Sequence, residues 1–363
     1  MLATDDHRFM GQALQLAERG LYTTTPNPRV GCVIVKDGVV VGEGAHLRAG
    51  EPHAEVFALR QAGELANGAD VYVTLEPCSH HGRTPPCANA LIIAGVKRVV
   101  VAMQDPNPRV AGSGIALLRA QGIEVEVGLL QAKAEALNPG FISRMTRGLP
   151  YVRSKIAASL DGRTALSNGE SKWITGETAR ADVQHWRACS CAIMTGVCTV
   201  LADDPQMTVR TLDIGRQPLR VVADSRLRIS PDAKILQGGN VLLAYATDPD
   251  NKLKALQQTG VELLQLADSE GRVCLPSLLR ALAERQINEV MVEAGQGFNG
   301  ALLQQNLIDE YILYYAPIIM GSDAKGMFAI PALTDMQQRT ELEILELSQV
   351  GDDIRLRARP KKS

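Results

Sequence analysis

The feature that most constrains this chain is the placement of two cysteines and a histidine within an alternation of strands and helices. His53 stands at the start of a predicted helix over 52–64, and Cys87 stands at the start of another, over 85–95. Cys78 follows a predicted strand over 69–77. Zinc prefers thiolate and imidazole ligands, and three protein ligands leave a fourth position for water. The pattern therefore predicts a zinc site within a layered α/β domain.

The residues around these ligands match a known catalytic pattern in part. His53-Ala54-Glu55 and Pro77-Cys78 fit the zinc deaminase arrangement H-x-E followed by P-C-x-x-C. Glu55 is near enough to the predicted metal to move protons from a bound water to a leaving amine. The second cysteine departs from the pattern, because it comes nine positions after Cys78 rather than three. By spacing alone, His80 or His81 remains an alternative ligand. In a plainer interpretation there is no metal site, and the segment contains two core cysteines and a pair of surface histidines.

The pattern of apolar residues predicts two domains. Residues 5–19 read as a helix, and 31–46 read as a hairpin around the turn Asp37-Gly38. Residues 138–150 are rich in Pro, Gly and Arg and are interpreted as a linker. Strand–helix alternation then restarts, with strands at 191–196, 219–224, 241–245, 289–293 and 311–316 and helices at 177–189, 276–285 and 298–306. We expect an N-terminal domain over 1–146 and a C-terminal domain over 150–363.

Composition excludes several classes of protein. The net charge of −2 provides no basic field for nucleic acid or an anionic membrane surface. No apolar run reaches the roughly 20 residues that span a bilayer, and the acidic start lacks the order of a signal peptide. Seven cysteines, an odd number, argue against a complete disulfide framework. We therefore expect a cytoplasmic protein with reduced thiols and neither a nucleic-acid nor a membrane partner.

A glycine-rich loop marks the second domain. Gly295, Gly297 and Gly300 match G-x-G-x-x-G between a predicted strand and a predicted helix, where backbone N–H groups can cradle a phosphate. A Rossmann fold would place an acidic residue about 20 positions later, and this chain has none there. The sequence thus predicts a phosphate-binding loop outside a Rossmann fold.

Four segments of the first domain together resemble one family. "TPNPRVGCVIV", "GEPHAEVFAL", "VTLEPCSHHGRTPPC" and "DPNPRVAG" are similar to the deaminase domain of the RibD family of bifunctional riboflavin biosynthesis proteins, which carries eight residues between its zinc cysteines. The resemblance implies a cytidine-deaminase-like α/β/α fold, with His53, Cys78 and Cys87 as zinc ligands and Glu55 as the proton shuttle. It also implies a set of substrate-binding residues: Asn27, His46, His80, Arg83 and Asn107. Arg83 suits a phosphate, although the family often has Lys there. From the residues alone, both asparagines fit local turn roles equally well.

The second domain resembles the same family's reductase domain, which has a dihydrofolate-reductase-like α/β fold and uses NADPH. The resemblance rests on "KIAASLDGRTA", "SKWITG", "TGVCTVLADDPQMTVR", "VVADS" and "VEAGQGFNGALL". It implies catalytic roles for Lys155 and Asp203. The implied substrate-binding residues are Ser171, Arg187, Met207, Arg210 and Glu293. The implied cofactor-binding residues are Ala157, Trp173, Thr199, Asp203, Ser225, Gly295, Gln296, Gly297, Phe298, Asn299, Gly300 and Ala301.

Chemistry supports part of this assignment. Reduction of an imine or a ring-opened glycosylamine needs a proton donor, for which Lys155 and Asp203 are candidates. Arg187 and Arg210 suit a sugar phosphate. In the plainer interpretation, Trp173 belongs to the core and Asp203-Asp204-Pro205 is only a turn.

The combined expectation is a bifunctional enzyme with one zinc ion per deaminase site and NADPH. It would deaminate 2,5-diamino-6-ribosylamino-4(3H)-pyrimidinone 5′-phosphate and then reduce the ribosyl chain, giving 5-amino-6-(5-phosphoribitylamino)uracil. We expect a small phosphorylated pyrimidine as substrate and a homo-oligomer, dimer or tetramer. One alternative, a zinc deaminase acting on nucleic acid with an accessory binding domain, predicts basic stripes and stacking aromatics, but aromatics are only 4%. Another, a non-enzymatic protein with structural zinc, predicts four protein ligands.

Overall fold

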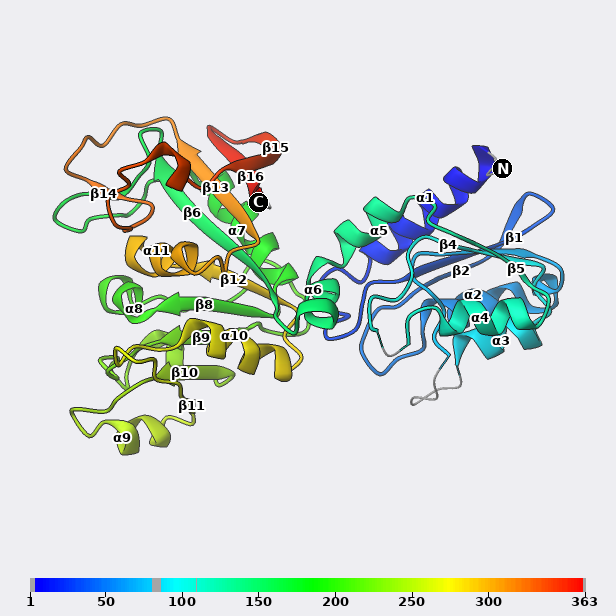
Figure 1. Ribbon diagram of the computed structural model, residues 1–363, viewed down its shortest axis with the longest axis horizontal. Coiled ribbons are helices and arrows are strands. Elements are labelled where there is room, and N and C mark those ends of the chain that lie inside the picture. Colours follow the sequence, from blue (N-terminus) through cyan, green and yellow to red (C-terminus); the bar gives the residue numbers. More distant parts are fainter. Residues whose placement is uncertain (1–3, 80–85, 109, 362–363) are drawn as a thin grey trace. The chain divides into compact units, whose positions relative to one another are not determined.

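The computed structural model describes residues 4–79, 86–108 and 110–361 (Figure 1). The chain divides into two compact units, Met1–Gly148 and Leu149–Ser363. No helix among the described residues is both long enough and apolar enough to cross a membrane.

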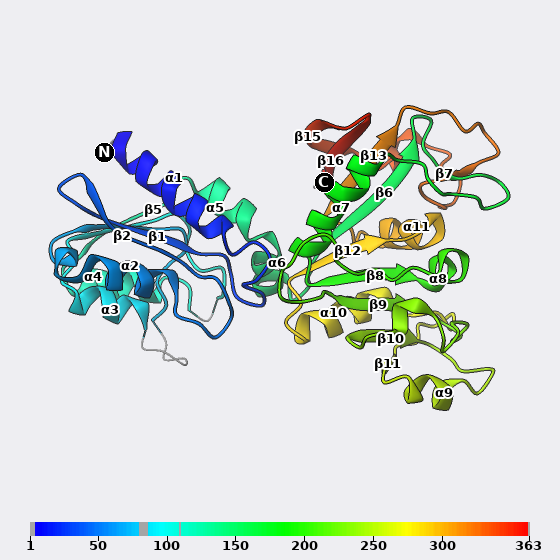
Figure 2. The same cartoon turned by 180° about the vertical axis from the view of Figure 1, so that it is seen from behind.

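The first unit is a five-stranded sheet covered by helices on both faces. Its strand order is β2-β1-β3-β4-β5, with β1 antiparallel to both neighbours and β3, β4 and β5 parallel. The strands are β1 (Gly31–Lys36), β2 (Val39–Ala45), β3 (Asp70–Val73), β4 (Arg98–Val101) and β5 (Glu124–Val127). Helices α1 (Thr4–Glu18) and α5 (Gln131–Leu137) lie over one face. Helices α2 (Ala54–Ala62), α3 (Cys87–Ile93) and α4 (Ser113–Ala120) lie over the other (Figures 1 and 2).

Small residues let the helices pack closely on the predicted hairpin, which the structure confirms. Asp37 and Gly38 form the turn with positive φ angles of 49° and 79°. A Cβ on Gly31 would collide with the backbone of α1 at Ala13, and one on Gly44 would collide with α2 at Ala54. Both helices therefore contact strand backbone directly, and α2 brings its first turn close to the end of the sheet.

The segment predicted as a linker is instead largely helical, forming α6 (Pro139–Arg147). Pro139 opens this helix, where its missing N–H costs nothing, and Gly148 ends it in a left-handed conformation. The buried Asn138 fixes its start, since its side chain exchanges two hydrogen bonds with the backbone of Arg29. The Pro and Gly that suggested a linker are the start and stop residues of a short helix.

The second unit is built on a nine-stranded sheet in the order β11-β10-β9-β8-β12-β6-β13-β16-β15. The strands from β11 to β13 are parallel to one another, and β16 and β15 are antiparallel to their neighbours. The strands of this sheet are β6 (Tyr151–Ser159), β8 (Ala192–Gly196), β9 (Leu219–Ala223), β10 (Val241–Tyr245), β11 (Glu262–Gln265), β12 (Glu289–Glu293), β13 (Glu310–Ala316), β15 (Leu342–Val350) and β16 (Asp353–Pro360). A separate pair joins β7 (Arg163–Ala165) to β14 (Lys325–Gly326). The helices are α7 (Glu177–Cys189), α8 (Val197–Asp203), α9 (Leu253–Gln258), α10 (Leu275–Glu284) and α11 (Gln296–Gln304).

Alternating side chains divide the core of this sheet between its two faces. On β8, Met194 joins the apolar cluster that includes α10 and α11, whereas Ile193 joins the cluster on the other face. On β9, Val221 and Val222 divide in the same way. The chain runs from β6 to β8 and outward to β11 before β12 returns between β8 and β6. In open α/β sheets such a reversal of strand order is where ligands bind, at the carboxyl ends of the strands.

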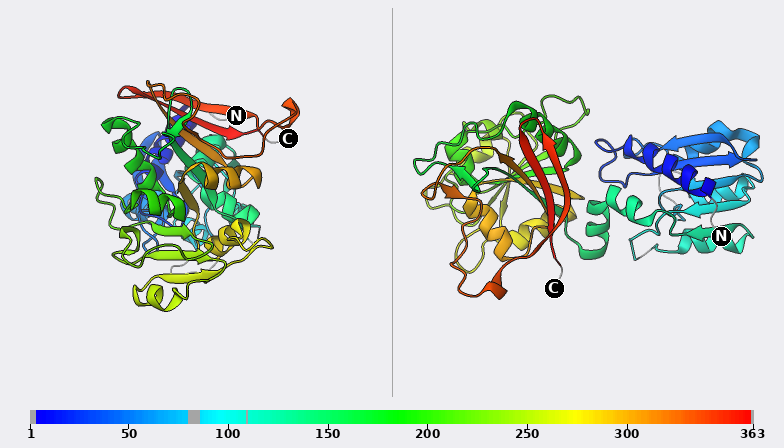
Figure 3. Two further views of the ribbon diagram at one scale, coloured as in Figure 1. Left: turned by 90° about the vertical axis from the view of Figure 1, so that its left-hand side faces the viewer. Right: turned by 90° about the horizontal axis from the view of Figure 1, so that it is seen from above.

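The sequence reasoning missed the C-terminal hairpin of β15 and β16, which forms one edge of this sheet (Figure 3). The hairpin lacks the buried alternation of a typical strand pair, because most of β15 is exposed. Ion pairs hold it instead, with Glu346 on β15 paired to Arg355 and Arg357 on β16 at 2.5 and 3.0 Å.

Candidate active sites

Three candidate metal ligands converge where two helices of the first unit begin. His53 immediately precedes α2 with extended backbone, Cys87 is the first residue of α3, and Cys78 lies on the segment that follows β3. His53 Nδ1 is 3.7 Å from Cys78 Sγ and 3.3 Å from Cys87 Sγ. All three ligand atoms lie within 4.8 Å of one another. The long spacing between the cysteines is thus compatible with convergence on one point.

The electrostatics of this cluster suit a cation. Hydrogen bonds from Cys87 and His53 lower the pKa of the Cys78 thiol to about 4, and the Cys87 N–H donates to the same sulfur at 3.3 Å. The hydrogen bond with Cys78 and burial raise the pKa of the Cys87 thiol. One thiolate is therefore stable as the cluster stands, and a divalent cation would favour the second. Two thiols and an imidazole are the donor set that zinc prefers, so these residues fit the metal.

Glu55 supplies an uncommitted carboxylate beside the candidate ligands. It is only 3% exposed, and its Oε2 has no hydrogen-bond partner among the described residues. Burial raises its pKa to about 6, against the opposing charge of His53. A buried carboxylate oxygen without a partner is costly unless a ligand or water completes it. Glu55 thus has an oxygen available for an incoming molecule.

His46 and Asn27 form a fixed pair next to the cluster. The His46 ring lies edge-on to the ring of His53, with centroids 5.3 Å apart. Asn27 Nδ2 donates to His46 Nε2 at 3.0 Å, and His46 Nδ1 donates to the Pro52 carbonyl at 3.1 Å. Burial lowers the pKa of His46, so the neutral ring with its proton on Nδ1 satisfies both contacts. The structure brings both predicted substrate residues to the candidate zinc site.

Of the other substrate residues predicted for this unit, the structure describes only Asn107. His80 and Arg83 lie outside the described residues. Asn107 sits in a turn, where its N–H donates to Asp105 Oδ1 at 2.8 Å and its carbonyl accepts from the N–H of Val110 and of Ala111. The backbone of Asn107 thus performs the local role that turn chemistry predicts.

Sequence reasoning missed Glu76, which orders the segments around Cys78. This buried carboxylate accepts four backbone hydrogen bonds. Its Oε2 binds the N–H groups of Asp105 and Gly112 at 3.1 and 2.9 Å, and its Oε1 binds those of Gly114 and Ile115 at 2.8 and 3.2 Å. Two of these groups belong to the first turn of α4, where an anion is favourable. No local signal reveals this role, because every partner lies about 30 or more positions away along the chain.

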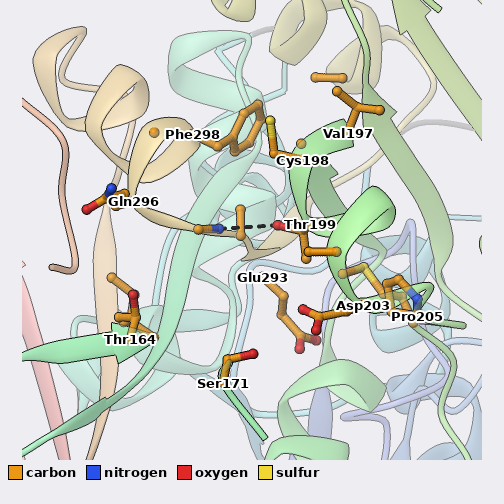
Figure 4. Close-up of a pocket in the computed structure, with 18 of the residues that line it drawn as sticks. Thr164, Ser171, Val197, Cys198, Thr199, Asp203, Pro205, Glu293, Gln296 and Phe298 are labelled. Carbon is orange, nitrogen blue, oxygen red and sulfur yellow. Dashed lines mark hydrogen bonds between the residues drawn. The ribbon is translucent and has the colours of Figure 1, made fainter. Parts of the chain in front are cut away.

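The second unit contains a cavity of about 1360 Å³ at the carboxyl ends of β6, β8, β9 and β12 (Figure 4). Most of the residues predicted for the reductase line it. They are Lys155, Ala157, Ser171, Trp173, Arg187, Thr199, Asp203, Met207, Arg210, Ser225, Glu293, Gly295, Gln296, Gly297, Phe298 and Ala301. The cavity therefore coincides with the reversal of strand order.

A cluster of charges occupies the centre of the cavity. Lys155 on β6 and Glu293 on β12 are paired residues of adjacent strands. Arg187 holds the Glu293 carboxylate with two hydrogen bonds of 2.6 and 2.9 Å. Burial lowers the pKa of Lys155, with the charge of Glu293 acting in opposition. Burial alone would raise the pKa of Glu293, but Arg187 outweighs it and the pKa is lowered.

Two arginines predicted to bind substrate, Arg187 and Arg210, line the cavity. Arg187 also donates to the Thr208 carbonyl at 3.0 Å, so its guanidinium is largely occupied. Arg210 is exposed at the cavity.

The glycine loop meets α8 at the rim of the cavity. The Gly295 N–H donates to Thr199 Oγ1 at 3.3 Å, and a Cβ on Gly295 or Gly297 would meet nothing within 4 Å (Figure 4). Two predicted cofactor residues turn away from the cavity. The Asn299 amide is buried, accepting from Ser154 Oγ at 2.8 Å and donating to the Ala294 carbonyl at 2.7 Å, and Gly300 packs on the backbone of Ala329. Both lie on the inward face of α11.

Two residues that had plainer interpretations, Trp173 and Asp203, both line the cavity. Trp173 is not a core residue, since it is 70% exposed, lines the cavity and carries Arg180 over its ring at 4.8 Å. Asp203 is the last residue of α8, and Asp204 ends that helix in a left-handed conformation with a φ of 43°. Asp203 nevertheless faces the cavity, where its carboxylate lies 3.7 Å from Lys172 Nζ.

Comparison with known proteins covers both units. Residues 3–103 match the family model of the cytidine and deoxycytidylate deaminase zinc-binding region, and residues 150–356 match that of the RibD C-terminal domain. The riboflavin biosynthesis protein RibD of Escherichia coli is 51% identical over 361 residues, covering 96% of this chain and 98% of that protein. The chain belongs to the RibD family.

Solved RibD structures extend this likeness to the fold. Form 1 of Acinetobacter baumannii RibD has 50% identity and a TM-score of 0.92, with 99% of each chain covered. A Thermotoga maritima protein described as a diaminohydroxyphosphoribosylaminopyrimidine deaminase/5-amino-6-(5-phosphoribosylamino)uracil reductase has 34% identity and a TM-score of 0.87, covering 98% of this chain and 99% of that chain. The predicted fold class, a cytidine-deaminase-like domain followed by a RibD reductase domain, is confirmed.

Proposed function

We propose that this RibD-family chain catalyses two consecutive steps of riboflavin biosynthesis, a zinc-dependent deamination in the first unit and an NADPH-dependent reduction in the second. The first substrate is 2,5-diamino-6-ribosylamino-4(3H)-pyrimidinone 5′-phosphate, and the final product is 5-amino-6-(5-phosphoribitylamino)uracil. The description of the Thermotoga maritima protein as a deaminase and reductase supports this pair of reactions. The observation that carries the proposal is the convergence of His53, Cys78 and Cys87 beside the unpartnered Oε2 of Glu55.

In the first unit, His53, Cys78 and Cys87 would hold zinc. When bound, zinc lowers the pKa of a coordinated water so that it can react near neutral pH. Glu55 Oε2 accepts a proton from the attacking water and passes it to the ring nitrogen beside the amino-bearing carbon. A second transfer through the same carboxylate moves the remaining hydroxyl proton to the amino group, which leaves as ammonia as the carbonyl forms. The raised pKa of Glu55 suits a group that must both take and release a proton.

Other residues of this unit orient the substrate. The neutral His46 ring and the Asn27 amide form a rigid polar wall beside His53, fixed by their mutual hydrogen bond. By the family resemblance we assign His80, Arg83 and Asn107 to substrate binding, with Arg83 suited to the substrate phosphate.

In the second unit, the glycine loop and Thr199 would hold NADPH, which supplies a hydride when bound. The Glu293 carboxylate is fixed by Arg187 and lies opposite Lys155 on the neighbouring strand, where its charge acts on the ammonium group. Reduction of a C=N group consumes one hydride at carbon and one proton at nitrogen. Lys155 gives that proton, and its lowered pKa makes it a stronger acid than an exposed lysine. Asp203 at the cavity rim is the second polar group available to orient the ribosyl chain.

The decisive experiment gives the purified chain the diaminopyrimidine substrate with and without NADPH. Ammonia release and the loss of NADPH absorbance are followed together. We expect ammonia in both samples and NADPH oxidation only after ammonia appears. A Glu55→Gln variant should retain zinc but release ammonia at least about 10²-fold more slowly. Parental ammonia release by that variant would overturn the assignment of Glu55.

We further propose that the chain acts in the cytoplasm as a homo-oligomer. The candidate zinc ligands include two cysteine thiols, and a thiolate metal site needs a reducing compartment. Apolar side chains gather on the exposed C-terminal edge of the second unit. Ile344 and Leu347 on β15 are 65% and 68% exposed, and Met336 is 73% exposed. Association of two copies through this edge would remove that apolar surface from water. Sedimentation analysis tests the proposal, and a monomer at micromolar concentration would contradict it.

A further inference from the structure

The carboxyl edge of the second sheet provides consecutive positions for a long ligand. Lys155 on β6 and Glu293 on β12 mark the reacting centre, and the glycine loop at the start of α11 follows β12. Next come Thr199 after β8 and Ser225 after β9. Adjacent strands lie about 4.8 Å apart, so the end of β9 is about 10 Å from the glycine loop. If its nicotinamide lies at the reacting centre and its diphosphate on that loop, a dinucleotide would extend its adenosine half toward β9.

Two arginines stand at that far position. Arg226 and Arg228 directly follow Ser225, line the cavity and are exposed. The fully buried Leu227 and Ile229 separate and anchor them. The buried Asp224 holds this turn, since its carbonyl accepts from the Leu227 N–H at 3.2 Å and its carboxylate accepts from the Ile229 N–H at 2.8 Å. The backbone is thus fixed while both guanidinium groups project outward.

These arginines differ from neighbouring cations of the cavity. Lys234 is paired with Asp204 at 3.0 Å, and Arg272 is paired with Glu270 at 2.6 Å. Within the described part of the chain, no carboxylate lies within 4.0 Å of the guanidinium of Arg226 or of Arg228. The recorded contact of the Arg228 guanidinium is with the Cys198 sulfur at 3.3 Å. Two cations without acidic partners beside a ligand cavity favour an anionic ligand.

We propose that Arg226 and Arg228 bind the 2′-phosphate of NADPH and set its preference over NADH. The inference rests on the proposed reductase function and adds the group that distinguishes the two nucleotides. A guanidinium presents a fork of donors that matches a phosphate, and each charge-assisted hydrogen bond strengthens binding. The diphosphate is assigned to the glycine loop, because backbone N–H groups at a helix start can bind a phosphate without a cationic side chain.

The test measures binding to the intact chain as well as turnover. Calorimetry with 2′,5′-ADP and 5′-AMP compares ligands that differ only in the 2′-phosphate, using the parent, Arg226→Ala/Arg228→Ala, and the control Arg280→Ala/Lys254→Ala. The control removes two exposed positive charges that do not line the cavity. We expect the first double variant to weaken 2′,5′-ADP about tenfold or more and to leave 5′-AMP unchanged. The control should change neither.

Turnover separates this inference from the proposed function. With the deaminated substrate, kcat/KM for NADPH should fall in the arginine variant while kcat/KM for NADH stays the same. A parent that oxidises neither nucleotide would refute the proposed reductase function. A parent that prefers NADPH, with a variant that keeps that preference, would refute only the role of the arginines. If the arginine variant lost affinity equally for 2′,5′-ADP and 5′-AMP, the arginines would bind a phosphate that both ligands share, and the inference would be overturned. If ribose 5-phosphate competed less well with the deaminated substrate in the variant than in the parent, the arginines would bind the substrate phosphate, which would also overturn it.

Discussion

Glu76 should control the stability of the first unit and the order of its metal site, and Glu76→Gln isolates that role. The substitution preserves size but replaces one carboxylate oxygen with an NH₂ group. Each oxygen of Glu76 accepts two backbone N–H groups, so the new NH₂ faces two donors that it cannot satisfy. Hydrogen bonds to charged groups contribute about 1.5–3 kcal/mol each, so losing two costs about 3–6 kcal/mol. A domain is stable by only about 5–15 kcal/mol, so the loss is a large fraction of the total.

The assay is urea unfolding of the full chain, with zinc release measured at each urea concentration to report on the first unit. We expect Glu76→Gln to release zinc at a much lower urea concentration than the parent. Glu124→Gln is the matched control, because Glu124 is exposed on β5 of the same sheet. Reductase turnover reports the second unit and should be unchanged. Equal midpoints for Glu76→Gln and Glu124→Gln would refute the view that this carboxylate holds the segments around Cys78.

Three further predictions concern the separate sites and the C-terminal hairpin. Removing zinc with a chelator should stop ammonia release, while NADPH oxidation with the deaminated substrate continues; loss of both would contradict independent sites. Glu293→Gln should slow NADPH oxidation at least about 10²-fold with unchanged ammonia release, because Lys155 and Arg187 lose their shared carboxylate. The hydrogen bond from Ser348 and the nearby Arg355 and Arg357 lower the pKa of Glu346 from 4.5 to about 2. The stabilisation from this carboxylate is therefore complete above pH 4.5 and is lost as the pH falls toward 2. Glu346→Gln should lower Tm at pH 7, and its difference from the parent should shrink between pH 5 and pH 2; a constant difference would contradict this.

Residues with local signals were predicted well from the sequence. The hairpin around Asp37-Gly38 was marked by its turn, and α7 and β12 by their apolar periodicity. The candidate ligands were found because His53 and Cys87 stand at helix starts. Features that depend on distant contacts were not. Glu76 binds backbone groups across the fold, and Arg187 is held by a residue on another element.

The other differences between the sequence predictions and the structure concern which residues face solvent and which face the interior. Trp173 suggested a core residue by its type, yet it lies exposed at the cavity. The hairpin of β15 and β16 has ion pairs where a strand pattern expects buried apolar residues. Asn299 and Gly300 belong to a glycine-rich motif, but helical periodicity turns them inward. A motif in the sequence identifies the loop, whereas the geometry decides which of its residues reach the ligand.

The position of β12 in the sheet also constrains the order in which the second unit can form during synthesis. Strand β6 ends at Ser159, yet its two neighbours, β12 and β13, begin only at Glu289 and Glu310. Until the ribosome has passed those residues, β6 has no partner within the sheet and β8 has one open edge. Open edges invite pairing with other chains. A nascent or truncated chain that stops before β12 is therefore exposed to aggregation and lacks Glu293, whereas every strand of the first unit has by then been made.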